Sequence, residues 1–432
     1  MASTRLTKTF SSSGNRNKWT ISMWIKRSNL GSTQTLFACH QNNNYKTRLE
    51  IASDDELFFN DEYNGNTNGR IVSNAKLRDT SGWYHIVGIW DKDNSTSGDK
   101  IRFYINGSRI TSFSDTGNAP ANASTLNTDS LTHEIGSENN GSKFDGLMSH
   151  IHFCDGYAYE PTEFGSTDST TGEWKIKTTP SVSYGTNGFW ILKDGNSVTD
   201  QSPNTNNWTV SGGTLTKTED NPSNVFATFN VLNNDQGNSF SYGNNKVDIP
   251  QAKYFGGNST LGMSSGKYYC EIKLTGGSTD GSGNYKSFIG ITGNPAESTR
   301  ANRYLGQDTY SYGYQGEGGS VDNNASSTSY GNSYTVNDIV GVALDLDNNK
   351  LYFSKNGTWQ NSGDPTSGST GTGAVSIGTS PTGFWHFACS SSSTNYSTNH
   401  AANFGNGYFQ STAVSSAGTN ASNNGIFEYD VP

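Results

Sequence analysis

Alternation of apolar and polar positions with a period of two residues runs through most of the chain and predicts β-strands. The clearest case is the stretch from Trp83 to Ile110, WYHIVGIWDKDNSTSGDKIRFYINGSRI. Residues 83–90 are apolar at both sets of alternating positions, so we expect that strand to be covered on both faces. Residues 100–105 alternate strictly, and Asn106-Gly107 offers the two positive-φ residues of a tight hairpin. The stretch therefore predicts two paired strands that close in an Asn-Gly turn.

A second stretch, Asp338 to Trp359, has the same arrangement, DIVGVALDLDNNKLYFSKNGTW. In both stretches Ile-Val-Gly precedes an Asp-rich turn. A strand that begins with lysine then ends in Asn-Gly, with the same spacing from Lys100 to Asn106 as from Lys350 to Asn356. The repetition predicts two related β-sandwiches in tandem; the alternative is that two unrelated hairpins look alike.

The strand pattern divides the chain into four parts. We expect an all-β protein of two tandem antiparallel β-sandwiches, at residues 1–172 and 225–410, with a bridging segment at 173–224 and a polar C-terminal tail at 411–432. Helical periodicity is almost absent, and only Pro161 to Phe164 could begin a short helical turn. An apolar patch in the tail, around Ile426 to Tyr429, could dock on its own domain or on a neighbour.

Composition supports a folded protein with many turns. Glycine is abundant (50 residues against 10 prolines), and aromatic residues make up 12% of the chain, which disordered chains seldom reach. The net charge is −9 and no run of Lys or Arg occurs, so we expect no nucleic-acid partner. No apolar run is long enough to span a bilayer, and we expect no membrane insertion.

The four cysteines, Cys39, Cys154, Cys270 and Cys389, show no Cys-x-x-Cys spacing, which argues against a zinc site. Each has apolar neighbours, and we expect buried free thiols. Oxygen ligands crowd the loop of the first hairpin, at Asp91, Asp93, Asn94 and Asp99. Such spacing could hold Ca²⁺; the alternative is a turn with solvated side chains. Beyond Ca²⁺ we expect no cofactor.

Five aromatic residues are candidates for a ligand platform. A sugar ring can stack on an exposed aromatic face and bond to a tyrosine hydroxyl. Three candidates follow one another at alternate positions, and two end strands beside loops: Tyr310, Tyr312, Tyr314, Trp359 and Trp208. The alternative for the three tyrosines is packing inside the sandwich.

The order of motifs resembles two known families. The strands WTISMWIK, WYHIVGIW, KIRFYING and FDGLMSHIHFCDG are similar to a laminin-G/concanavalin A-type jelly roll over about residues 5–165. YGYQGEGG and IVGVALDLDNNKLYFSKNGTW are similar to a SPRY-type sandwich over about residues 225–410. The connector that ends in DNPSNVFATFN resembles marine bacteriophage virion proteins that pair these two domains.

The resemblance implies a phage structural protein, a tail-fibre or head-appendage component. Its partners would be other virion proteins and a host-surface glycan, and it would be a homo-oligomer on the particle after assembly in the host cytoplasm. We expect no enzyme, because the Glu-x-Asp-x-x-Glu run of related glucan hydrolases is absent. No Ser-His-Asp grouping is evident. A purely structural decoration protein and a glycan hydrolase remain the alternatives.

Overall fold

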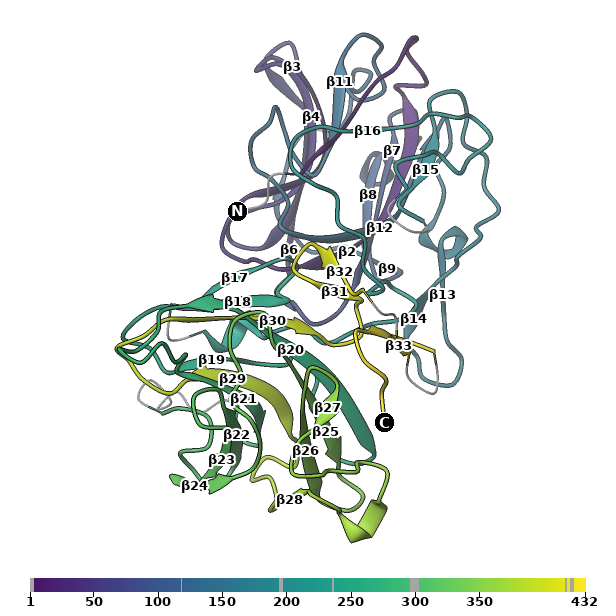
Figure 1. Cartoon of the computed structure of the whole chain (residues 1–432). Coiled ribbons are helices and arrows are strands. Elements are labelled where there is room, and N and C mark those ends of the chain that lie inside the picture. Colours follow the sequence, from purple (N-terminus) through teal and green to yellow (C-terminus); the bar gives the residue numbers. More distant parts are fainter. Residues whose placement is uncertain are drawn as a thin grey trace. The chain divides into compact units, whose positions relative to one another are not determined.

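The computed structural model describes residues 4–117, 119–193, 197–234, 237–295, 303–415, 418–419 and 423–432. The chain forms two compact units, Met1–Lys217 with Asn221–Val225 and Thr218–Asp220 with Phe226–Pro432 (Figure 1). Each unit is a pair of packed sheets with antiparallel strands, which confirms the predicted fold class. The helical segments among the described residues are 3-10 turns, η1 (Ser97–Asp99), η2 (Pro161–Glu163), η3 (Val231–Asn233) and η5 (Gly368–Thr370), of which η2 confirms the predicted turn.

The first unit has a sheet of eight strands and one of six. The larger follows the order β10 (Phe113–Thr116), β6 (Asn66–Lys76), β5 (Glu56–Tyr63), β4 (Tyr45–Ile51), β3 (Gln34–Asn42), β11 (Thr132–Ile135), β1 (Leu6–Thr9) and β16 (Thr209–Val210). The smaller follows β15 (Phe189–Ile191), β12 (Gly146–Asp155), β2 (Lys18–Arg27), β7 (Tyr84–Asp91), β8 (Ile101–Ile105) and β9 (Ser108–Arg109). A separate ladder joins β13 (Gly165–Thr167) to β14 (Trp174–Ile176).

Strand β7 lies between two apolar layers, as its sequence predicts. Ile86 and Trp90 belong to the core between the two sheets, and Val87 and Ile89 belong to a second cluster on the other face of the smaller sheet. Segment 156–184 supplies aromatic rings to that second cluster. The smaller sheet is therefore covered on both sides.

Residues 173–224, expected as a bridging segment, contribute three strands to the first unit. β14 pairs with β13, β15 with β12, and β16 with β1. Phe189 and Trp208 of this segment are buried in the core between the sheets, where they contact each other at 4.9 Å between ring centroids. Burial of these large rings explains why the segment folds with the sandwich.

The second unit repeats the two-layer plan. One sheet follows β17 (Ser239–Ser241), β18 (Lys246–Ile249), β30 (Thr398–Asn403), β20 (Lys267–Gly277), β25 (Ile339–Asp345), β26 (Lys350–Lys355) and β27 (Thr358–Trp359), and β28 (Val375–Ser376) also pairs with β26. The other follows β19 (Phe255–Asn258), β29 (His386–Ser391), β21 (Ser287–Thr292), β22 (Ser311–Gln315), β23 (Ser320–Asn323) and β24 (Ser326–Ser329).

The tail is part of the second unit. Its strand β32 (Thr412–Ala413) pairs with β31 (Tyr408–Phe409), which precedes the tail, and its strands β33 (Gly418–Thr419) and β34 (Ile426–Phe427) pair with each other. Phe427 is buried and lies 5.2 Å from Tyr269 between ring centroids. The apolar patch predicted in the tail thus docks on its own domain.

Candidate functional site

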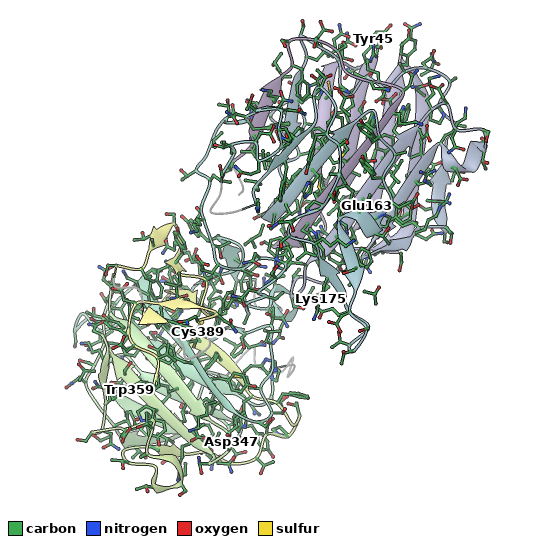
Figure 2. The ribbon with its side chains drawn as sticks, turned by 90° about the vertical axis from the view of Figure 1, so that its right-hand side faces the viewer. Tyr45, Glu163, Lys175, Asp347, Trp359 and Cys389 are labelled. Atoms are coloured by element: carbon green, nitrogen blue, oxygen red, sulfur yellow. The ribbon has the colours of Figure 1, made fainter. Side chains whose placement is uncertain are left out.

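The aromatic residues predicted as a platform do not share a surface. Tyr312 and Tyr314 of β22 are buried in the core of the second unit, where the Tyr314 hydroxyl donates to the Asn332 carbonyl. Trp208 is buried in the first unit. Trp359 is half-buried against Tyr269 and belongs, like Asp347, to the second unit (Figure 2). The platform prediction is wrong for Trp208, Tyr312 and Tyr314. The two tyrosines lie on the face of β22 that packs in the core, which is the alternative stated for them, and Trp208 packs in the core of the other unit.

Tyr310 is the exception. It precedes β22, and its side chain is 41% exposed. A single exposed tyrosine without its predicted neighbours offers one stacking face and no defined cleft, so it does not by itself form a site.

The acidic side chains of the first hairpin loop form ion pairs with lysine and arginine side chains. Asp91 contacts Lys18 at 3.2 Å, Asp93 contacts Lys92, and Asp99 contacts Arg109 at 2.5 Å. Asn94 donates to Asp91 Oδ2 at 3.3 Å. Within the described ranges, no group of three His, Cys, Asp or Glu side chains is placed to hold a metal ion. The predicted Ca²⁺ site is therefore corrected to a loop held by ion pairs.

Three buried serine–histidine contacts are present among the described residues, one between the sequence neighbours Ser149 and His150 at 2.8 Å and two between distant residues, and none was predicted from the sequence. Ser287 Oγ lies 2.7 Å from His400 Nε2, and Ser22 Oγ lies 2.8 Å from His85 Nε2. Burial lowers the pKa of both histidines to about 3. Neither pair reaches solvent, and the other ring nitrogen of His85 accepts from the Trp174 indole at 3.0 Å. These two pairs are hydrogen bonds inside the sandwiches, and neither presents its serine to a substrate.

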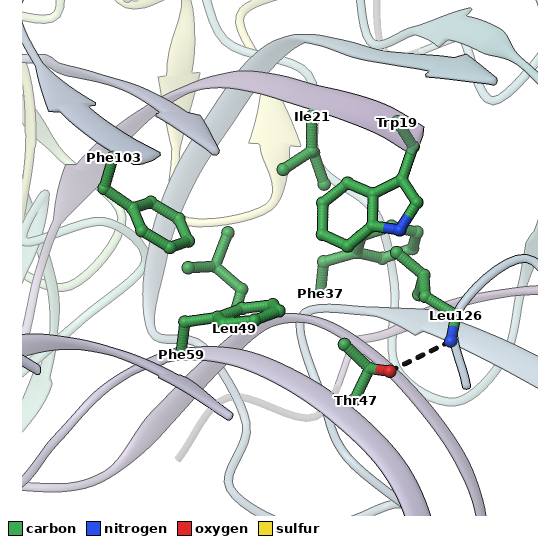
Figure 3. Close-up of a pocket in the computed structure, with 8 residues that line it drawn as sticks. All are labelled: Trp19, Ile21, Phe37, Thr47, Leu49, Phe59, Phe103 and Leu126. Carbon is green, nitrogen blue, oxygen red and sulfur yellow. Dashed lines mark hydrogen bonds between the residues drawn. The ribbon is translucent and has the colours of Figure 1, made fainter. Parts of the chain in front are cut away.

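A small cavity lies between the two sheets of the first unit (Figure 3). Its volume is about 10 Å³, which is at most the space of one water molecule. The lining is apolar except for Thr47, whose hydroxyl accepts from the Leu126 backbone N–H at 2.9 Å. The cavity is a packing gap and not a ligand site.

An open groove with polar walls crosses strands β1, β11 and β16 at one edge of the larger sheet of the first unit. Its volume is about 510 Å³. Hydroxyl, amide and cationic groups line it: Arg5, Thr7, Lys8, Thr9, Thr132, Asn207, Thr209 and Ser211. Each is a hydrogen-bond donor, and the hydroxyls and the amide also accept.

The local sequences of the three strands explain this lining. In β1, Leu6 enters the core while Thr7 and Thr9 remain on the groove side. The register places Thr9 opposite Thr132 and Thr7 opposite Thr209. Hydroxyls from three strands that are far apart in sequence thus meet on one surface.

The wall formed by residues 200–209 is held by a buried carboxylate. Asp200 Oδ1 accepts from the Trp190 and Ser202 backbone N–H groups at 2.8 Å each, and Oδ2 accepts from the Asn206 N–H at 2.7 Å. Trp208 fixes the other end of the wall in the core. The turn-rich motif DQSPNTNNW therefore builds a defined wall.

Two cations border the groove. Arg5 pairs with Glu134 at 2.8 Å. Desolvation lowers the pKa of Lys8, and the charge of Asp200 opposes this shift. The groove is therefore hydroxyl-rich with weak positive charge in a chain whose net charge is −9.

The fold defines the class of protein: a two-domain β-sandwich protein with a concanavalin A-like domain followed by a SPRY domain. Residues 4–163 match the family model described as the concanavalin A-like lectin/glucanases superfamily, and residues 267–376 match the SPRY domain model. No described helix has the length and apolar character that a membrane-spanning helix requires.

Among curated relatives, Ran-binding protein 9 of Danio rerio is 36% identical over 93 residues, which covers 21% of this chain and 14% of that protein. The ATP-dependent RNA helicase DDX1 of Xenopus laevis is 29% identical over 126 residues, covering 28% and 15%. The chain thus spans about one seventh of the length of these relatives.

Among solved structures, the SPRY domain of human HERC1 has a TM-score of 0.27 at 15% identity and covers 36% of this chain and 86% of that one. A putative carbohydrate binding protein from Bacteroides ovatus has a TM-score of 0.34 at 15% identity, covering 49% and 58%.

Proposed function

We propose that the protein is a non-enzymatic binding protein whose first domain recognises a saccharide in the groove over β1, β11 and β16. The observation that carries the proposal is the lining of that groove, which consists of hydroxyl, amide and cationic groups. Sugar hydroxyls both donate and accept hydrogen bonds, and threonine and asparagine side chains match them in both roles. The cations at Arg5 and Lys8 favour a saccharide that carries acidic groups.

The test is binding to an array of neutral and acidic polysaccharides with the variant Thr9→Val/Thr132→Val. This variant keeps the shape of two facing side chains and removes their hydroxyls. Loss of one or two hydrogen bonds should weaken binding by about 3- to 30-fold. Thr116→Val, on the exposed strand β10 of the same sheet, is the matched control and should bind like the wild type. Equal binding by all three proteins would refute the groove as the site.

We further propose that the protein is displayed on a bacteriophage particle as a tail-fibre or head-appendage component, next to other virion proteins. The support is the sequence resemblance described above. Many copies on one particle would raise the overall affinity of weak saccharide contacts. Mass spectrometry of purified particles should find the protein in stoichiometric amounts, and its absence there would contradict this placement.

One cluster favours glycan hydrolysis as a second candidate function. On the face of β4 away from the core, Glu50 and Glu138 approach the same guanidinium nitrogen of Arg48, at 3.5 and 3.6 Å, and His40 lies 3.3 Å from Glu138. Burial raises the pKa of Glu50, as hydrolysis by paired carboxylates requires of the acid. The activity would be established if the wild type releases reducing ends from a polysaccharide and neither Glu50→Gln nor Glu138→Gln does. If the wild type releases none, the cluster is an ion-pair network.

A further inference from the structure

Trp174 joins a short two-stranded ladder of the first unit to the smaller sheet. The ladder consists of β13 and β14, which pair with each other beside β9 (Figure 1). The ring of Trp174 lies against the first hairpin turn, where a β-carbon on Gly107 would come within 2.5 Å of it. Its indole N–H donates to His85 Nδ1 at 3.0 Å. This hydrogen bond ties the ladder to strand β7.

The hydrogen bonds of His85 require a neutral imidazole. Because the indole N–H is only a donor, Nδ1 must be unprotonated to accept from it. The proton of the ring then lies on Nε2, which donates to Ser22 Oγ at 2.8 Å. The ring is fully buried and stacks on Trp24 at 4.7 Å between centroids. A second proton, on Nδ1, would face the N–H of Trp174, donor against donor, inside the protein.

His152 lies on β12, on the same face of the sheet, and differs in this respect. Its Nδ1 lies 2.9 Å from the hydroxyl of Tyr184, which can accept a hydrogen bond as well as donate one. A protonated His152 can therefore keep its partner, whereas a protonated His85 cannot keep Trp174. The two histidines give a matched pair for comparison.

The surroundings of His85 do not compensate a positive charge on its ring, and burial lowers its pKa to about 3. The titratable and charged groups on the elements around it are Lys26 of β2, Arg102 and Tyr104 of β8, Arg109 of β9, His150 and His152 of β12, Glu173 and Lys175 of β14, and Glu160, Asp99 and Asp168, which pair with Arg102, Arg109 and Lys175. The acids in this set are thus paired with cations or, in Glu173, exposed.

We propose that His85 and Trp174 form an acid-sensitive latch, which releases the β13–β14 ladder from the smaller sheet when His85 takes up a proton. The proton comes from solvent and binds Nδ1 in the released state, where water hydrates the imidazolium. Release uncovers the His85 ring and the Asn106-Gly107 turn, and neutral pH restores the hydrogen bond. The inference is independent of saccharide binding in the groove.

The sign and size of the effect follow from the lowered pKa. Above the ordinary value of 6.5 the ring is neutral in both states, so the closed latch is unaffected. The closed latch is destabilised progressively as the pH falls from 6.5 toward 3. The ratio of released to closed ladder should therefore rise by about 25-fold between pH 7 and pH 5.

Hydrogen exchange of the full chain, followed by mass spectrometry at pH 7 and pH 5, tests the latch. After correction for the pH dependence of the chemical exchange step, the backbone amides of residues 165–176 should exchange about 25-fold faster at pH 5. The amides of β2 and β7 should stay protected, because the sandwich remains folded. Unchanged exchange in the ladder, or equal acceleration in β2 and β7, would overturn the proposal.

Two glutamine variants separate the latch from a general effect of buried histidines. In His85→Gln the amide offers an acceptor to Trp174 and a donor to Ser22 and does not titrate, so the corrected exchange of the ladder should be the same at both pH values. His152→Gln is the matched control and should keep the acceleration of about 25-fold. Both variants are first checked for the thermal transition of the wild type. Acceleration that persists in His85→Gln, or that disappears in both variants, would refute His85 as the sensor.

Discussion

Removing the buried anion beside Arg27 should destabilise the first unit. The Arg27 guanidinium is fully buried and donates to Asp55 Oδ1 at 2.9 Å. The change Asp55→Asn keeps the shape of the side chain, and asparagine tolerates the φ of 73° at this position. It removes the negative charge, so a buried cation loses its counter-ion.

Asp55→Asn should lower the free energy of unfolding by about 3 kcal/mol or more, which is the usual effect of removing one partner of a buried ion pair. For a domain of this size, a loss of about 3 kcal/mol lowers Tm by about 6–12 °C. Arg78 contacts the same carboxylate at 3.0 Å, but its side chain is 59% exposed. The control Arg78→Gln should therefore cost no more than about 1 kcal/mol.

Tryptophan fluorescence during thermal unfolding is the assay. Seven of the nine tryptophans lie in the first unit, so the signal reports mainly on that unit. The double variant Arg27→Met/Asp55→Asn removes both charges and should recover most of the loss. If Asp55→Asn and Arg78→Gln shift Tm equally, the buried pair is not the source of the stability.

The same ion pair predicts a dependence on pH. Burial alone would raise the pKa of Asp55, but hydrogen bonds from Arg78, the Gly31 N–H and Arg27 lower it below its ordinary value of 3.8. A carboxyl with a lowered pKa contributes stability above its ordinary value and loses it as the pH falls through the lowered value. The Tm difference between wild type and Asp55→Asn should therefore be full at pH 7 and shrink below about pH 4.

Three further predictions concern both units. Burial raises the pKa of Glu271 to about 7, so the protonated side chain stabilises the second unit fully below the ordinary value of 4.5, and this contribution is lost as the pH rises through 7. In Glu271→Gln the free energy of unfolding of the second unit, measured with urea, should therefore vary less between pH 5 and 8. An unchanged slope with pH would contradict this assignment. The change Trp174→Ala should expose His85 and lower the stability of the first unit by about 3 kcal/mol, measured by the same method, whereas Lys175→Ala on the adjacent exposed position should have little effect. The four cysteines are buried thiols whose pKa burial raises, and they should react with a thiol reagent only after unfolding.

Short-range sequence patterns predicted the fold well. The groove of the first unit depends instead on how strands that are distant in sequence pair with one another. The hairpin at Asn106-Gly107 could be predicted because adjacent residues determine it, and both glycine turns adopt positive φ. The groove could not be predicted, because Thr9 meets Thr132 only through strand pairing between distant segments. Alternation alone cannot tell an exposed aromatic face from a buried one. It therefore left a surface platform and packing inside the sandwich as alternatives for Tyr312 and Tyr314, and the structure has both rings in the core.

The pairing of β1 with β16 bears on how the protein is made. Leu6 lies opposite Val210 in the sheet register, and Trp208 completes the core that β1 helps to enclose. During synthesis, the ribosome must release roughly two hundred residues before the first strand obtains its final neighbour. Closure of this edge joins segments of very large sequence separation, which slows folding. Until then the nascent chain presents an unpaired strand edge, and chaperone binding there would protect it from association with other chains.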